Sequence, residues 1–115
     1  MQNMILVYTT CESLFRAKAL SKLLLKKRLC ACTNILPNMT SLYLWPAKSK
    51  KITKSKEVIL LIKTLKAKYK AIEKTIKANH TYETPAIFSI SIDQVSKDYY
   101  AWIEDGLVPG FGRIP

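Results

Sequence analysis

The spacing of apolar residues changes along the chain, and each change marks the border between an expected strand and an expected helix. Residues 4–10 form a short run of β-branched and apolar residues, which is typical of a buried strand. After Ser13, the residues Ala17, Leu20 and Leu24 fall on one helical stripe, while the basic residues Arg16, Lys18, Lys22 and Lys26 face outward. The chain therefore begins with an expected strand and an amphipathic helix.

Two further strand patterns occupy the middle of the chain, and the first of them is interrupted. Residues 30–36 and 41–45 both have the composition of a strand, and Pro37 lies between them. Because proline cannot donate to a β-ladder, the pattern predicts one bent or bulged strand. After a lysine-rich reversal over residues 48–56, the apolar residues of 57–64 predict a central strand that is covered on both faces.

The last part of the chain predicts a second helix, a strand and a short third helix. Four apolar residues, spaced by four, three and four positions, fall on one helical face: Leu65, Tyr69, Ile72 and Ile76. Residues 84–92 alternate between apolar and polar at their end, as a strand does. Residues 98–105 carry aromatic and apolar side chains at helical spacing.

The order strand, helix, strand, strand, helix, strand is that of the ferredoxin-like βαββαβ fold. We therefore expect an α+β protein, a two-layer sandwich with an extra C-terminal helix. A chain of 115 residues is long enough for one such domain, with its core over about residues 4–105. All three glycines lie within residues 106–115, which predicts an irregular C-terminal tail.

The formal net charge of +11 favours anionic partners, but the type of basic residue argues against a dedicated site for them. Sixteen of the nineteen basic residues are lysines, which carry solvated point charges, whereas arginine would offer bidentate forks for phosphate. We therefore expect no specific nucleic acid as partner. Neither a signal-peptide pattern nor an apolar run of membrane-spanning length is present, so we expect a cytoplasmic protein that binds no membrane.

Metal binding is one chemistry that the candidate side chains could support. His80 is the only histidine, and imidazole is a preferred ligand of copper and zinc. A stable site needs three or four ligands, so the Glu83 carboxylate and the cysteine thiolates are further candidates. Cys30 and Cys32 are two residues apart in an expected strand, which would place both on one face. Alternatively, His80 caps the second helix or lines a subunit boundary, and the cysteines are small buried hydrophobes.

Several segments, in their order and spacing, make the chain resemble the CutA divalent-cation-tolerance family. The match spans about residues 4–105. The segments are residues 7–10 (Val-Tyr-Thr-Thr), 29–37, 41–45 (Ser-Leu-Tyr-Leu-Trp), 57–64, 80–85 (His-Thr-Tyr-Glu-Thr-Pro) and 100–103 (Tyr-Ala-Trp-Ile). Any one of them would be weak, whereas the set is specific.

The resemblance implies a homotrimer, similar in shape to the PII signalling proteins, whose long second and third strands pair with neighbouring subunits. It gathers five residues around the intersubunit cleft: Tyr8, Tyr43, Trp45, Lys63 and Tyr82. It also implies binding of copper or another divalent ion, and it selects Cys32 as the metal candidate beside His80 and Glu83. Three positions differ from the family. Tyr8 stands where some members have cysteine, Asn79 where some have a second histidine, and Thr81 where proline is usual.

The expected function is that of a trimeric binding protein for a divalent metal ion, with copper as the first candidate, and not that of an enzyme. One histidine and eight acidic residues do not form a recognisable catalytic set. One alternative is a PII-like trimer that binds a small anion through Lys63 or anchors other proteins. A basic nucleic-acid-binding domain is the other, although residues 57–64 lack the stacking aromatics of an RNA-recognition sheet.

Overall fold

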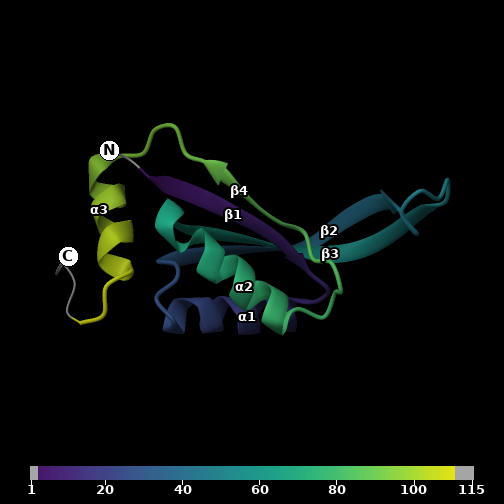
Figure 1. Ribbon diagram of the computed structural model, residues 1–115, viewed down its shortest axis with the longest axis horizontal. Coiled ribbons are helices and arrows are strands. Elements are labelled where there is room, and N and C mark those ends of the chain that lie inside the picture. Colours follow the sequence, from purple (N-terminus) through teal and green to yellow (C-terminus); the bar gives the residue numbers. More distant parts are fainter. Residues whose placement is uncertain (1–2, 111–115) are drawn as a thin grey trace.

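A computed structural model describes residues 3–110, and its helices and strands follow the expected order (Figure 1). The elements are β1 (Met4–Cys11), α1 (Leu14–Lys26), β2 (Cys32–Leu44), β3 (Ile52–Leu65), a 3₁₀ turn (Lys66–Lys68), α2 (Tyr69–Asn79), β4 (Ile87–Ser91) and α3 (Lys97–Gly106). The strands form one antiparallel sheet in the order β2-β3-β1-β4. The predicted ferredoxin-like sandwich with an extra C-terminal helix is therefore confirmed.

Helices α1 and α2 cover the same face of the sheet, and the core lies between these two layers (Figure 1). Leu60 and Ile62 of β3 are fully buried there, together with Leu24 of α1 and Ile76 of α2. Removal of such side chains from water is the main force that holds the helices on the sheet. Within residues 3–110, no helix is long and apolar enough to cross a membrane.

The opposite face of the sheet is left open by α1 and α2, which corrects the expectation of a central strand covered on both faces. Along β3, Val58, Leu60 and Ile62 are buried toward the helices, while Ile59 and Leu61 are only partly buried. Successive residues of a strand point to opposite faces, so the continuous apolar run of β3 supplies both faces with apolar side chains. One set packs on helices, and the other set is available for a partner.

Strands β2 and β3 continue beyond the rest of the sheet as a protruding hairpin (Figure 1). Their pairing reaches Leu44 and Ile52, whereas β1 pairs with β3 only from Val58 onwards. The hairpin explains why the radius of gyration is 15.6 Å, against about 13 Å for a compact chain of this length. The predicted reversal over residues 48–56 is therefore too long, because β3 begins at Ile52.

The predicted interruption of β2 is confirmed as a shift in its pairing with β3. Leu36 pairs with Ile59 but Met39 pairs with Glu57, so two residues of β2 oppose one residue of β3. Asn38 takes up the extra length with a φ of 62°, a left-handed conformation that asparagine tolerates. This shift sets the register beyond it, which brings Ser41 beside Glu57.

Other boundaries also differ from the sequence-based expectation. Leu65 ends β3, where it pairs with Met4, and does not belong to the second helix. The last strand covers only Ile87–Ser91, because the preceding residues form a loop that is described below. Of the predicted tail, Gly106 still belongs to α3, residues 107–110 are turn and bend, and residues 111–115 lie outside the described part.

Candidate functional site

A cleft lies where the hairpin leaves the body of the sheet, on the face that the helices leave open. Its volume is about 690 Å³. It is lined by Tyr8, Thr10, Ser41, Leu42, Tyr43, Trp45, Ser55, Glu57, Tyr82, Glu83, Thr84 and Ala86. These residues come from β1, from both hairpin strands and the turn between them, and from the loop between α2 and β4. We call the space between them the hairpin cleft. Five predicted site residues meet here: Tyr8, Tyr43, Trp45, Tyr82 and Glu83.

The Glu57 carboxylate is the most tightly held group of the hairpin cleft. The Ser41 hydroxyl donates to its Oε1 at 2.6 Å, and the Tyr82 hydroxyl donates to its Oε2 at 2.8 Å. Ser41 comes from the neighbouring strand and Tyr82 from the loop after α2, so three segments of the chain meet at one carboxylate. Hydrogen bonds to an ionised acceptor are stronger than neutral ones, and these two orient both oxygens.

The hydrogen bonds among Ser41, Glu57 and Tyr82 also determine which of these side chains is ionised. Burial alone would raise the pKa of Glu57, but hydrogen bonds from Ser41, Tyr82 and Thr10, with a Coulombic contribution from His80, hold it below its ordinary value. Burial raises the pKa of the Tyr82 phenol, and the hydrogen bond to Glu57 raises it further. An ionised carboxylate therefore lies beside a protonated phenol at neutral pH.

We expect acid to destabilise the protein partly through Glu57. Because its pKa in the folded state lies below the ordinary 4.5, its stabilising contribution is present above that pH and is lost as the pH falls through the lowered value. Urea unfolding between pH 7 and pH 3 should show a smaller loss of stability for Glu57→Gln than for the unchanged protein. Glu104→Gln, at an exposed carboxylate on α3, is the control. Equal acid sensitivity in all three proteins would contradict this assignment.

His80 organises the loop that presents Tyr82. Its Nε2 is 2.7 Å from the carbonyl oxygen of Thr10, and its Nδ1 accepts a hydrogen bond from the backbone N–H of Tyr82 at 3.0 Å. Because Nδ1 accepts, Nε2 is the ring nitrogen that donates to the Thr10 carbonyl oxygen. His80 is also the C-cap residue of α2. Both ring nitrogens are therefore engaged, and a metal ion would have to replace one of these hydrogen bonds.

Behind His80 lies a second, smaller hollow of about 200 Å³, which also contains Cys11. Burial raises the pKa of the Cys11 thiol to about 11, with further increases from the charges of Glu57 and Glu12. A metal ligand must be the thiolate. Cys11 is therefore a packed thiol and not a ready ligand at neutral pH.

The three predicted metal ligands do not meet within one chain. Cys32 pairs with Lys63, which is six residues along β3 from Glu57, a separation of about 20 Å along an extended strand. His80 and Glu83 lie near the Glu57 end. Among residues 3–110, no three His, Cys, Asp or Glu side chains are grouped as a metal site would require.

Cys30 and Cys32 also differ from the expectation that they share a strand face. The strand begins only at Cys32, so the alternation rule does not apply to Cys30. Cys30 is buried in the core beneath the helices, and burial raises the pKa of its thiol to about 12. Cys32 is partly exposed beside Lys63.

Lys63, the predicted anion ligand, lies outside the hairpin cleft. Its Nζ stands over the ring of Tyr99 from α3, 5.6 Å from the ring centroid. This cation–π contact holds the ammonium group at the end of the sheet that faces α3. Lys63 and Cys32 thus lie at one end of the sheet, whereas His80 and Glu83 lie at the other.

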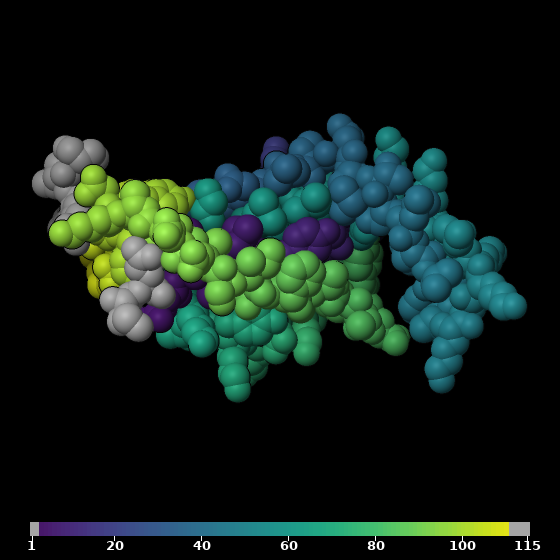
Figure 2. Space-filling view, turned by 90° about the horizontal axis from the view of Figure 1, so that it is seen from above, coloured from purple at the N-terminus to yellow at the C-terminus, as the bar shows by residue number. Residues whose placement is uncertain are grey.

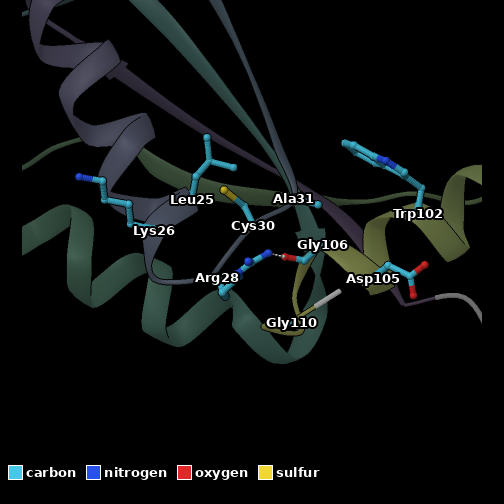
Figure 3. A pocket seen from close by; sticks show the side chains of 9 residues that line it. All are labelled: Leu25, Lys26, Arg28, Cys30, Ala31, Trp102, Asp105, Gly106 and Gly110. Atoms are coloured by element: carbon cyan, nitrogen blue, oxygen red, sulfur yellow. Dashed lines mark hydrogen bonds between the residues drawn. The ribbon is translucent and has the colours of Figure 1, made fainter. Parts of the chain in front are cut away.

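A further hollow of about 550 Å³ lies between the end of α1 and α3 (Figure 3). It is lined by Leu25, Lys26, Arg28, Cys30, Ala31, Trp102, Asp105, Gly106 and Gly110. The Arg28 guanidinium donates to the carbonyl oxygen of Gly106 at 3.3 Å and so joins the two segments. Gly106 packs so tightly that a Cβ there would lie 2.7 Å from that of Ala31. Cys30 is the one predicted candidate here, and its thiol is buried.

Large apolar side chains are exposed on the open sheet face and along the hairpin. Figure 2 looks onto this side, where atoms of β1 remain visible between β4 and the hairpin strands. The exposed residues are Leu36, Leu42, Tyr43, Leu44, Trp45, Ile52, Phe88 and Ile90. Phe88 stacks on Tyr8 with ring centroids 4.7 Å apart. Exposed apolar surface of this extent marks an interaction site in soluble proteins.

The most important residue that the sequence did not single out is Glu57. It directly precedes the apolar run of β3, which is the only signal that its sequence position offers. Its partners Ser41 and Tyr82 are 16 and 25 residues away. Only the strand register and the path of the loop show that these groups converge.

Comparison with known proteins agrees with this architecture. Residues 5–106 match the family model described as CutA1 divalent ion tolerance protein. The Divalent-cation tolerance protein CutA of Pyrococcus horikoshii is 38% identical over 100 residues, which cover 87% of this chain and 94% of that protein. The Protein CutA homolog of Xenopus laevis is 35% identical over 102 residues, covering 89% of this chain but only 65% of that longer protein.

Solved structures give the same result. The CutA1 crystal structure from Ehrlichia chaffeensis superposes with a TM-score of 0.87 at 32% identity, covering 94% of this chain and 98% of that one. The periplasmic divalent cation tolerance protein CutA from Archaeoglobus fulgidus gives a TM-score of 0.86 at 33% identity, covering 91% of this chain and 99% of that one. Because the family model and the full-length relatives cover nearly the whole fold, the chain belongs to the CutA1 divalent ion tolerance family.

Proposed function

We propose that the protein is a cytoplasmic homotrimer that binds a divalent metal ion, with copper as the first candidate, in clefts shared between neighbouring chains. Binding, and not catalysis, is the activity. The observation that carries the proposal is the ionised Glu57 carboxylate, held by Ser41 and Tyr82 inside a cleft with one wall formed by a protruding hairpin. Its relatives are named as divalent-cation tolerance proteins, which supports an ion as the ligand.

The case for assembly begins with the hairpin. Strand β2 lies at the edge of the sheet, so its outer backbone donors and acceptors are free to pair with a neighbouring chain. Leu42, Leu44 and Trp45 are between 55% and 67% exposed, which is costly for a chain that stays alone. A neighbouring copy would cover these side chains and close the hairpin cleft from the side that is now open.

The donors of one chain fit a metal ion in part. Glu57 and Glu83 both line the hairpin cleft, and carboxylate oxygens are good ligands for divalent cations. Copper and zinc favour imidazole, and His80 supplies it if it releases Thr10 or Tyr82. The remaining ligands must come from water or from a neighbouring chain, and Cys32 of a neighbour is one candidate.

Native mass spectrometry with and without copper or zinc tests both parts of the proposal, because it reports subunit number and bound metal together. We expect a trimer that takes up metal, and affinity about 10- to 100-fold weaker for Glu57→Gln and Glu83→Gln. His80→Ala should weaken copper binding more than binding of an ion that prefers oxygen, such as manganese. Glu104→Gln is the matched control. A trimer that binds all these ions equally well in every variant would exclude the hairpin cleft as the metal site.

Lys63 supports a second candidate function, the binding of a small anion in the manner of a PII-like trimer. Lys63 is partly buried on the open sheet face, and its ammonium group stands over the Tyr99 ring, where it could meet a carboxylate or phosphate group. Isothermal titration with inorganic phosphate and Lys63→Met tests this possibility. Heat that is unchanged by the substitution would exclude it.

A further inference from the structure

The outer face of the helix layer carries two rows of lysines. Each helix contributes three of them, and all six are exposed: Lys18, Lys22 and Lys26 on α1, and Lys70, Lys74 and Lys77 on α2. At 100° per residue, each row lies opposite the buried stripe of its helix, which contains Leu20 and Leu24 on α1 and Ile72 and Ile76 on α2. The rows therefore point mainly away from the sheet, with Lys18 toward the side of α1, and we call this surface the lysine face.

The charge of the lysine face is not balanced within the chain. Glu73 is the only acidic residue in α1 and α2, and it accepts a hydrogen bond from Tyr69. No ion pair is found for any of the six lysines within residues 3–110, whereas Arg16 at the rim pairs with Glu12 at 3.9 Å. Like charges four residues apart on a helix repel one another, so both rows lower the stability of their helices. An anionic partner would remove this repulsion.

The lysine face lies on the side of the sheet opposite to the open face and the hairpin cleft (Figure 1). An assembly through the open face would therefore leave the lysine face accessible. Metal binding in the cleft and binding of a polyanion to the helices do not compete for the same residues. The inference below consequently stands apart from the proposed metal function.

The chemistry of the lysine face matches a row of phosphates. Lysines four residues apart repeat about every 6 Å along a helix, and packed helices place the two rows about 8–10 Å apart. Small residues beside the rows, Ala19, Ala71 and Ala78, are exposed and allow a polymer backbone to come close. Neither row contains the arginine, asparagine or glutamine side chains that typically distinguish base pairs.

We propose that the lysine face binds the phosphate backbone of double-stranded nucleic acid without reading its base sequence. A membrane surface fits less well, because interfacial helices set large apolar side chains beside their lysines. The outer surface of α2 exposes none, and α1 exposes Leu14, Phe15 and Leu25 only near its two ends. Lysine is also adequate here, since a point charge suffices for backbone contacts that release counterions.

Fluorescence anisotropy of the full chain with a labelled DNA duplex of about 20 base pairs, at salt concentrations between about 50 and 200 mM, tests the proposal. The key variant is K70Q/K74Q/K77Q, since glutamine keeps the helix propensity of lysine. The matched control is K50Q/K54Q/K56Q, which removes the same charge from the exposed hairpin. Circular dichroism melting verifies that both variants remain folded.

We expect the unchanged protein to bind duplexes of different sequence equally, with affinity that falls steeply with salt. Each lost phosphate contact should flatten the slope of log affinity against log salt by about 0.9, so the α2 variant should lose about 2.7 and bind on the order of 100-fold more weakly at 100 mM salt. The hairpin variant should change much less. Three results would overturn the proposal: no binding at the lowest salt, an equal loss in both variants, or tighter lysine-dependent binding to vesicles with about 30% phosphatidylserine than to DNA.

Discussion

Replacing Leu61 with lysine should convert the trimer proposed above into single chains, while each chain keeps its fold. Leu61 lies at the centre of the open sheet face, between Tyr8 of β1 and Asn34 of β2, and is only partly buried. In a lone chain the lysine stem can extend into water. Against a neighbouring copy the charge would be buried without a partner, at a cost of about 3 to 5 kcal/mol at each interface. Such a cost weakens association by roughly 100-fold or more.

Sedimentation at micromolar protein distinguishes the outcomes for Leu61→Lys. Leu25→Lys is the matched control, since Leu25 is an exposed leucine on α1, away from the open face. Far-ultraviolet circular dichroism establishes that the variant chains are folded. If Leu61→Lys sediments like the unchanged protein, the open face is not the contact between chains, and the hairpin cleft stays open on that side.

The substitution of the neighbouring residue, Leu60→Ala, should act on the fold itself. Leu60 is 0% exposed and belongs to the core beneath α1 and α2. Truncating a fully buried leucine removes apolar contacts and leaves a cavity, which costs about 2 to 5 kcal/mol of unfolding free energy. This is a large fraction of the stability of a small domain, about 5 to 15 kcal/mol.

Urea unfolding at a fixed protein concentration measures the effect of Leu60→Ala, because the proposed assembly would make stability depend on concentration. Leu61→Ala is the control one residue further along the same strand, and its cost in a dilute, dissociated sample should be much smaller. Equal losses in the two variants would mean that the two faces of β3 are equally buried in the lone chain. The pair therefore separates the packing of the helix layer from contacts on the open face.

The two proposed binding surfaces divide the molecule by charge as well as by position. Glu57 and Glu83 collect in the hairpin cleft, where hydrogen bonds stabilise an ionised carboxylate. The six lysines of the lysine face lie on the other side of the sheet. A cation and a polyanion would thus bind to separate surfaces of opposite charge. Substitutions at one surface can remove its binding and leave binding at the other surface intact.

Hydrophobic spacing alone was sufficient to predict the order of the elements. A strand alternates with period two and a helix with period 3.6, and both periods are local properties of the chain. Ser13 is a clear local signal, since its hydroxyl accepts a hydrogen bond from the backbone N–H of Arg16 and caps the start of α1. The interruption of β2 at Pro37 was equally local. The motifs that make the chain resemble the CutA family are also short local segments, so they could be recognised from the sequence.

Contacts between distant segments were not accessible in this way. The apolar run of β3 predicted a strand but not which of its faces the helices cover, because that depends on where α1 and α2 pack. His80 was singled out as the only histidine, yet its hydrogen bonds to Thr10 and Tyr82 exist only once β1 and the loop lie together. Glu57 is identified as the centre of the cleft only by its hydrogen bonds to Ser41 and Tyr82, which are 16 and 25 residues away in the sequence. Periodicity is a property of neighbours along the chain, whereas a binding site is made by neighbours in space.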